Sequence, residues 1–261
     1  MTQPILVTGG TGTLGRRLVP HLREAGHDVR VLTRSSRPDE DGVTFVTGDL
    51  ASGEGVDKAV DGVATIVHCA GSSTGDEVTT RNLVQAAGRV GSPHLVYISV
   101  VGADRVPTAR RLDRMMFGYF RSKLASERVV VESGLPWTTL RATQFHDLIH
   151  QVVRAMAKLP VIPVPSGMRF QPVETDEVAA RLVSLASGEP AGLVPDFAGP
   201  RVYGAVELVH SYLRATGRRR PIVPLRLPGQ GARAVRAGAV TAPDRAVGRR
   251  TWEDFLAAAT Q

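Results

Sequence analysis

The 261-residue sequence contains a single cysteine, Cys69, and therefore no internal disulfide bond. No group of Cys and His residues has the spacing of zinc ligands, so we expect no metal site. A chain without disulfides is typical of the reducing cytoplasm, and the cytoplasm is the location that we predict.

Long apolar runs are absent as well. No stretch approaches the roughly 18–20 residues needed to span a bilayer. The first residues also lack the basic region and the apolar run of about 7–15 residues that mark a secretory signal. We therefore expect neither a membrane segment nor a leader. The hydrophobic share of 43% is that of an ordinary globular protein.

Lysine is scarce, since only three of the 32 basic residues are lysines, and the formal net charge is +7. Residues 214–250 contain ten arginines and one acid, Asp244. The plainest interpretation is a solvated surface. An anionic substrate or a self-association surface are the alternatives, so a monomer and a homodimer both stay open. Nucleic acid is not expected as a partner, because no aromatic–basic interleaving or binding motif accompanies the charge.

Short apolar segments rich in β-branched residues alternate with helical patterns through the first half of the chain. We predict strands at residues 4–8, 28–33, 43–47, 63–69, 94–99 and 137–141, and helices at residues 12–25, 56–60, 77–89 and 115–132. Continuous apolar strands joined by helical crossovers are typical of a parallel sheet covered on both faces. The predicted fold class is α/β, a doubly wound Rossmann fold.

Beyond residue 145 the pattern is looser. Residues 159–165 carry three prolines and predict an extended connection, whereas residues 178–186, 204–216 and 252–259 predict helices. We divide the chain at this point. Residues 1–145 form the Rossmann core, and residues 146–261 form a small substrate-side lobe that is integrated with the core into one domain overall.

The first predicted strand runs into a glycine-rich turn at residues 9–15. Gly9 permits a sharp exit from the strand, Gly12 lets the backbone approach a pyrophosphate, and Gly15 lets the following helix pack closely on the sheet. Backbone N–H groups at the helix start then face the phosphates. The turn predicts a dinucleotide site formed by Gly9, Thr11, Gly12, Thr13, Leu14 and Gly15.

The end of the second strand bears on the choice of dinucleotide. Folds selective for NAD usually place an acid there to accept from the ribose 2′-hydroxyl, whereas this chain has Arg34. A guanidinium pairs with a 2′-phosphate, and Arg16 is a second nearby cation, so NADP(H) is favoured over NAD(H). Asp49, followed by Leu50, is placed to accept from the adenine amino group. Small residues end the fourth strand, where a cofactor needs room: Cys69, Ala70 and Gly71.

Tyr119 and Lys123 place a phenol and an ammonium four residues apart on one face of a predicted helix. Tyr119 would donate a proton to a carbonyl oxygen, helped by the neighbouring cation, and Lys123 would also hold the nicotinamide ribose hydroxyls. Ser99 ends the fifth strand at the carboxyl edge of the sheet, where it would hydrogen-bond the same oxygen. The plainer alternative is an amphipathic tyrosine beside a solvated lysine.

These features together resemble the short-chain dehydrogenase/reductase superfamily, in its atypical, NmrA-like branch of NAD(P)H-binding proteins. The resemblance rests on residues 8–15, 68–71 and 140–145, Asp49, and the Tyr119–Lys123 pair, and it covers residues 3 to about 200. It implies a seven-stranded Rossmann sheet and the catalytic set Ser99, Tyr119 and Lys123. It also implies that residues 141–145, among them Thr143, line the nicotinamide end.

Apolar residues near Tyr119 bear on the substrate. They form either core or the wall of a pocket for a flat, apolar molecule: Met115, Met116, Phe117 and Phe120, with Met168 and Phe170 from the C-terminal part. His146 and Asp147 follow the expected nicotinamide end. They form either a capping or packing pair or an aid to proton transfer.

The leading hypothesis is an NADPH-dependent oxidoreductase that transfers a hydride to a small apolar carbonyl or quinone, with Tyr119 as the proton donor. Two alternatives stay open. The first is a non-catalytic NADP(H)-sensing regulator, because NmrA-like proteins include such members. The second is an epimerase, dehydratase or isomerase that keeps its cofactor bound between cycles.

Overall fold

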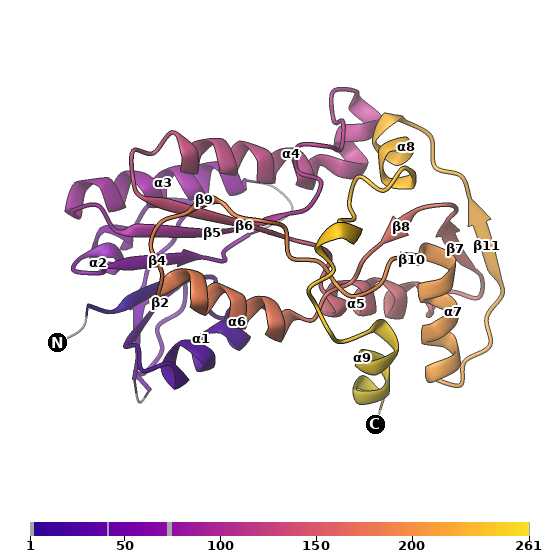
Figure 1. Ribbon diagram of the computed structural model, residues 1–261, viewed down its shortest axis with the longest axis horizontal. Coiled ribbons are helices and arrows are strands. Elements are labelled where there is room, and N and C mark those ends of the chain that lie inside the picture. The colour runs from indigo at the N-terminus through magenta and orange to yellow at the C-terminus, as the bar shows by residue number, and fades with distance from the viewer. Residues whose placement is uncertain (1–2, 41, 72–74, 261) are drawn as a thin grey trace. The chain divides into compact units, whose positions relative to one another are not determined.

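The computed structural model describes residues 3–40, 42–71 and 75–260 (Figure 1). The chain forms two compact units. Unit 1 comprises Met1–Ser99, Arg121–Leu140 and Asp176–Val194, and unit 2 comprises Val100–Phe120, Arg141–Thr175 and Pro195–Gln261. The units interleave along the chain, so that segments from both sides of residue 145 belong to each of them.

Unit 1 is built on a seven-stranded parallel sheet with the strand order β3-β2-β1-β4-β5-β6-β9. The predicted α/β Rossmann fold is therefore confirmed. The buried strands in the middle of the sheet read as continuous apolar runs because both faces are covered. The strands are β1 (Ile5–Thr8), β2 (Val29–Thr33), β3 (Val43–Thr47), β4 (Thr65–His68), β5 (His94–Val100), β6 (Trp137–Ala142) and β9 (Gly192–Leu193).

Helices cover both faces of this sheet (Figure 1). On one face lie α1 (Gly15–Glu24) and α6 (Thr175–Ala186), and on the other lie α2 (Val56–Val60), α3 (Asp76–Val90) and the second half of α4 (Arg111–Val131). Fully buried side chains between α3 and the strands form the core of unit 1, among them Leu6, Ile66, Leu83 and Leu95.

Helices α1 and α4 begin at residues other than those that the sequence predicts. Helix α1 begins at Gly15 and not at residue 12, because the intervening residues belong to the glycine turn, in which the Gly12 N–H donates to Gly9 O (2.9 Å). The helix ends before Gly26, whose φ of +84° is the left-handed conformation that stops helices. Helix α4 begins earlier than expected, at Arg111, and is kinked at Phe117, where φ is −128° and ψ is 16°.

Unit 2 contains four further helices within the described residues, α5 (His146–Met156), α7 (Ala205–Ala215), α8 (Gln230–Arg236) and α9 (Trp252–Ala259). It also holds two small sheets: β7 (Ile162–Pro165) pairs in parallel with β11 (Ile222–Leu225), and β8 (Arg169–Phe170) pairs with β10 (Tyr203–Gly204). Residues 159–165 were expected as a plain connection. Part of this segment is strand β7, and the 3-10 turn Pro243–Arg245 precedes α9.

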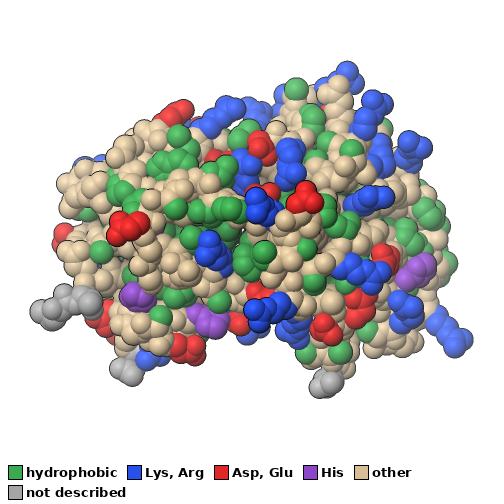
Figure 2. Space-filling view, viewed as in Figure 1, with side chains coloured by type: hydrophobic (Ala, Val, Ile, Leu, Met, Phe, Trp, Pro, Cys, Tyr) green, Lys and Arg blue, Asp and Glu red, His purple; other side chains and the backbone are tan. Residues whose placement is uncertain are grey.

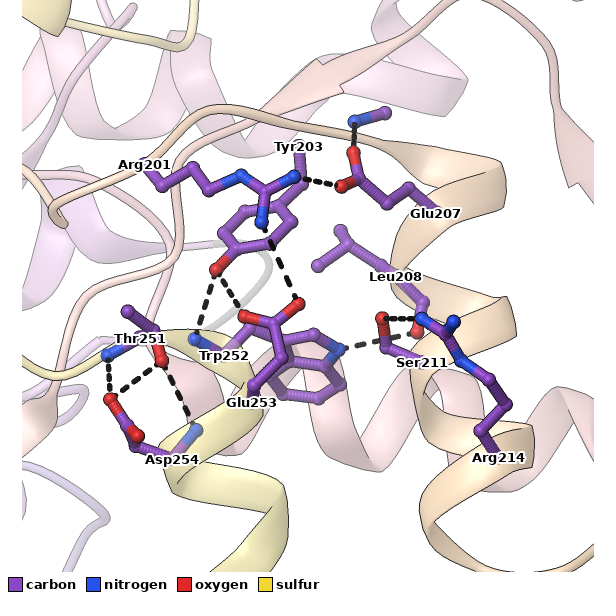
Figure 3. Close-up of polar contacts among 11 residues, drawn as sticks. Arg201, Tyr203, Glu207, Leu208, Ser211, Arg214, Thr251, Trp252, Glu253 and Asp254 are labelled. Atoms are coloured by element: carbon purple, nitrogen blue, oxygen red, sulfur yellow. Dashed lines mark hydrogen bonds and ion pairs between the residues drawn. The ribbon is translucent and has the colours of Figure 1, made fainter.

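The core of unit 2 is organised around Trp252, the first residue of α9, which is fully buried (Figure 3). Its indole Nε1 donates to Leu208 O (3.2 Å) in α7, and its backbone N–H donates to the Tyr203 hydroxyl (3.3 Å). Tyr203 in turn donates to Glu253 Oε2 (2.6 Å). These hydrogen bonds join α9, α7 and β10 at a defined geometry.

The arginine-rich residues 214–250 lie in unit 2, from the last turn of α7 through β11 and α8. Figure 2 shows Lys and Arg side chains spread over the region that carries these elements. One surface hollow is lined by Arg226, Arg233 and Arg236. Within the part of the chain that the structure describes, no helix is long and apolar enough to cross a membrane.

Candidate dinucleotide-binding site

A hollow of about 520 Å³ opens at the carboxyl ends of β1, β2, β3 and β4 in unit 1. This is the edge at which open α/β sheets bind their ligands. Residues of the glycine turn, of the loops after β2 and β3, and of the start of α3 line it: Gly9, Thr11, Gly12, Leu32, Thr33, Arg34, Gly48, Asp49, Leu50, Ala51, Cys69, Ala70, Gly71, Gly75, Asp76, Val78 and Thr79.

The glycine turn owes its shape to close backbone contacts. Gly9 has a φ of +70°, and a Cβ there would lie 2.6 Å from Ala70 N. A Cβ on Gly15 would lie 2.2 Å from Gly9 O, so α1 packs against the turn only because residue 15 is glycine. By contrast, a Cβ on Gly12 would meet only Gly9 O, at 3.2 Å. The other side of Gly12 is open toward the hollow that it lines.

Nine of the residues predicted to bind the cofactor line this hollow: Gly9, Thr11, Gly12, Arg34, Asp49, Leu50, Cys69, Ala70 and Gly71. Three residues of the turn, and Arg16 directly after it, are not among its lining residues. Leu14 is buried, Gly15 is inside the helix and Thr13 is exposed. The Arg16 Nε donates to Thr11 O (2.6 Å), so this side chain braces the turn from outside the hollow.

The end of β4 is a buried polar network without charge. The Thr8 hydroxyl lies 2.6 Å from His68 Nδ1, and His68 Nε2 lies 3.1 Å from the Thr80 hydroxyl. Burial, and then the charge of Lys123, lower the pKa of His68 to about 3. Burial raises the pKa of the Cys69 thiol to about 12. Both side chains are therefore neutral at physiological pH, and Cys69 acts as a small wall residue.

Lys123 is buried beside the hollow and not solvated. Its Nζ lies 3.3 Å from Asp76 Oδ2, and the two side chains are 5% and 3% exposed. The same Nζ donates to the Tyr97 hydroxyl and to Ile98 O, both at 3.4 Å. Asp76 lines the hollow, yet sequence reasoning missed it, because an acid at the first position of a helix is usually only a favourable dipole partner.

The remaining predicted residues occupy different environments. Ser99, near the carboxyl end of β5, is buried, and its Oγ makes no hydrogen bond to any residue that the structure describes. Tyr119 belongs to unit 2 and is 39% exposed, one helical turn before Lys123 in α4. Thr143 is buried in unit 2, where its hydroxyl accepts from Gly199 N (3.3 Å).

The candidate substrate wall is mostly core. Met168 is buried in the core of unit 2, and three partly buried aromatic side chains pack against the same cluster: Phe117, Phe120 and Phe170. Met115, by contrast, is 77% exposed. His146 begins α5 and is fully buried, with its ring 5.1 Å from that of Phe255. Asp147 accepts from the Thr175 hydroxyl (2.6 Å). The histidine thus packs against an aromatic ring of unit 2, and the aspartate accepts a hydrogen bond there.

Comparison with known protein families places the chain in a family. A family model described as NAD(P)H-binding matches residues 9–187, which include the glycine turn and every residue lining the hollow. The chain belongs to this NAD(P)H-binding family. The match confirms the predicted NAD(P)H-binding family, and the fold agrees with the resemblance to NmrA-like, atypical short-chain dehydrogenases/reductases.

Curated relatives of this NAD(P)H-binding protein include proteins of photosynthetic organisms. The chloroplastic protein High Chlorophyll Fluorescence Phenotype 244 of Arabidopsis thaliana is 29% identical over 82% of the chain and 55% of its own length. The photosystem II assembly factor Ycf39 of Synechocystis is 27% identical over 82% of the chain and 68% of its own length. The chain thus spans about half the length of the first of these relatives.

Among solved structures, an NADPH-dependent quinone oxidoreductase of Escherichia coli in complex with NADPH superposes with a TM-score of 0.81. The alignment covers 98% of the chain and 100% of that protein at 17% identity, which shows a shared fold. The residues present fit such a dinucleotide. The open side of Gly12 leaves room for a pyrophosphate, and Arg34 supplies a guanidinium for a phosphate. The family match confirms NAD(P)H as the cofactor.

Proposed function

We propose that this protein is an NADPH-dependent reductase that transfers a hydride to a small apolar carbonyl or quinone. One observation carries the proposal. The hollow joins a glycine turn to Arg34, in the position where NAD-selective folds have an acid, and the buried ammonium of Lys123 lies against its wall. We further propose that the protein works in the cytoplasm, as a monomer or a homodimer.

The protein's own residues would bind the dinucleotide, orient the substrate and protonate the substrate oxygen. The glycine turn holds the pyrophosphate, and Arg34 holds the 2′-phosphate. Asp49 fits the adenine end less directly, because its Oδ1 already accepts from Ala51 N (2.9 Å). NADPH, when bound, supplies the hydride that goes to the carbonyl carbon. The carbonyl oxygen takes the Tyr119 proton and becomes a hydroxyl, and the phenolate regains a proton from water.

Two more residues complete the proposed set. Lys123 supplies a fixed positive charge near the nicotinamide ribose, and Ser99 hydrogen-bonds the substrate oxygen. The half-exposed position of Tyr119 supports its role, because a proton donor must reach both the substrate and solvent. The quinone substrate is supported by the activity that the Escherichia coli neighbour's name states.

A second candidate function is favoured by the curated relatives. Because Ycf39 is named as an assembly factor, a non-catalytic protein that binds NADP(H) and docks on a partner also fits this chain. The two functions differ in whether bound NADPH is consumed. The redox-neutral epimerases among the structural neighbours share the fold, and they would keep the dinucleotide without net turnover.

Steady-state oxidation of NADPH against a panel of ketones and quinones tests the proposal. We expect turnover by the parent protein and a loss of at least about 100-fold in kcat for Tyr119→Phe, with NADPH affinity unchanged. Tyr212→Phe, in the buried core of unit 2, is a matched control that removes the same hydroxyl elsewhere. Turnover retained in Tyr119→Phe would exclude Tyr119 as proton donor. No turnover with tight NADPH binding would favour the assembly or redox-neutral role.

A further inference from the structure

The buried ion pair of Lys123 and Asp76 assigns a role to Asp76 that neither the motif nor the family match gives. The pair lies next to Gly71, which lines the hollow, as Asp76 itself does. A Cβ added to Gly71 would lie 3.1 Å from Lys123 Nζ and 3.4 Å from Asp76 Oδ2. Both charges are therefore held within one side-chain layer of the space in which the dinucleotide is proposed to bind.

We propose that Asp76 is a positioning residue that keeps the Lys123 ammonium charged and fixed against the wall of the hollow, so that dinucleotide affinity does not vary with pH through the neutral range. The inference rests on the proposed use of the hollow for the dinucleotide, and not on any chemistry at Tyr119.

Asp76 is an ion-pair partner of Lys123, and both side chains are buried. The titratable groups on the elements packed around the ammonium are Asp76 from α3, Tyr97 from β5, His68 and Cys69 from the end of β4, and Glu127 one turn further along α4. Glu127 acts electrostatically on Tyr97, against whose ring the ammonium also lies, 5.1 Å from the centroid.

Three of these groups carry no charge between pH 6 and pH 9. Burial lowers the pKa of His68 to about 3 and raises that of Cys69 to about 12, and burial likewise raises the pKa of Tyr97. A lysine buried to this extent takes the neutral form when no counter-charge is near, because desolvation penalises the ammonium. The Asp76 carboxylate, 3.3 Å from Lys123 Nζ, supplies that counter-charge.

Asp76→Asn keeps the size of the side chain and removes its charge. Calorimetric titration with NADP+ at pH 6, 7, 8 and 9 then compares the variant with the parent. Because the 2′-phosphate titrates equally in both experiments, the ratio of the two Kd values reports the protein alone. We expect this ratio to rise from under about 2 at pH 6 to about 10 at pH 9, as Lys123 loses its proton.

Two controls accompany the titration. Asp57→Asn removes an exposed carboxylate that pairs with Arg89 on the surface of unit 1, and its Kd ratio should stay near one. Asp76→Glu keeps the charge and should restore the flat profile. A ratio for Asp76→Asn that does not change with pH, whether at one or above it, would overturn the inference. Failure of the parent to bind NADP+ would instead overturn the proposed function.

A second measurement holds even if Asp76→Asn folds poorly. Removing one member of a buried ion pair leaves the other charge uncompensated, whereas removing both does not. We therefore expect Asp76→Asn and Lys123→Met each to lower the thermal unfolding midpoint, and the double variant to regain stability relative to Asp76→Asn. Additive losses in the double variant would show that the two side chains do not depend on each other, which contradicts the proposal.

Discussion

Arg34 offers the most direct test of cofactor choice. It follows the last residue of β2 and lines the hollow with Gly9 and Gly12. In an enzyme that prefers NADP(H), this guanidinium contacts the 2′-phosphate, a group that NAD(H) lacks. Arg34→Ala should therefore weaken NADPH binding and leave NADH binding nearly unchanged.

The magnitude follows from the exposure of the side chain. Hydrogen bonds to charged groups contribute about 1.5–3 kcal/mol, but exposed ion pairs only about 0.2–1 kcal/mol. Arg34 is exposed, and its partner carries close to two negative charges. We therefore expect a loss of roughly 1–2 kcal/mol, which is about 5- to 30-fold in Kd. Because salt screens exposed charges, the loss should shrink when the ionic strength is raised from about 0.05 M to 0.5 M.

Fluorescence titration with NADPH and with NADH measures the effect. Arg89→Ala, which removes one positive charge from the surface of α3 outside the hollow, is the matched control and should change neither Kd by more than about twofold. Equal losses for NADPH and NADH in Arg34→Ala would refute the reasoning, because they would place Arg34 on a part of the dinucleotide that both cofactors share.

Two further predictions concern stability. Gly15→Ala should lower the free energy of unfolding by at least about 2 kcal/mol in urea denaturation, because the new Cβ would lie 2.2 Å from Gly9 O, whereas Gly88→Ala, with no atom near its added Cβ, should raise it by about 0.5–1 kcal/mol. Folding lowers the pKa of His68 from 6.5 to about 3. The unfolded chain therefore takes up a proton first as the pH falls, and stability should drop by up to about 1.4 kcal/mol per pH unit from pH 6.5 toward pH 3. His68→Asn should show a shallower dependence, and equal slopes would contradict the assignment.

Much of the fold could be predicted where its signals are local. Strand β3 and helices α2 and α9 have the expected bounds, and β1 and β5 differ by one residue. Helix α5 was missed because it follows β6 closely and its N-cap residue, Phe145, makes no side-chain capping bond, so no start signal is present. Helix α8 was missed for a different reason. Its Gly231 N–H donates to Asp113 Oδ1 (2.9 Å), a cap supplied from a distant part of the sequence.

The residues of the candidate site also divide into those that the sequence could predict and those that it could not. The glycine turn could be located because its glycines have a recognisable spacing directly after the first predicted strand, and Arg34 because it directly follows the second. Asp76 could not, since its contact with Lys123 depends on how α3 and α4 cover the same face of the sheet. The apolar residues beside Tyr119 were ambiguous for a related reason. Helical spacing does not distinguish a side chain in the core from one in a pocket wall.

Tyr119 and Lys123 show why burial must be added to spacing before a mechanism is assigned. Their separation predicts one helix face, yet Lys123 is 4% exposed and paired with Asp76, whereas Tyr119 is 39% exposed. A fixed, desolvated charge stabilises developing charge better than a solvated one, because it needs no reorganisation. An exposed tyrosine, by contrast, contributes little to the core, so Tyr119→Phe should leave stability almost unchanged. A loss of turnover in that variant would therefore report chemistry, whereas the same loss in a Lys123 variant would first have to be separated from unfolding.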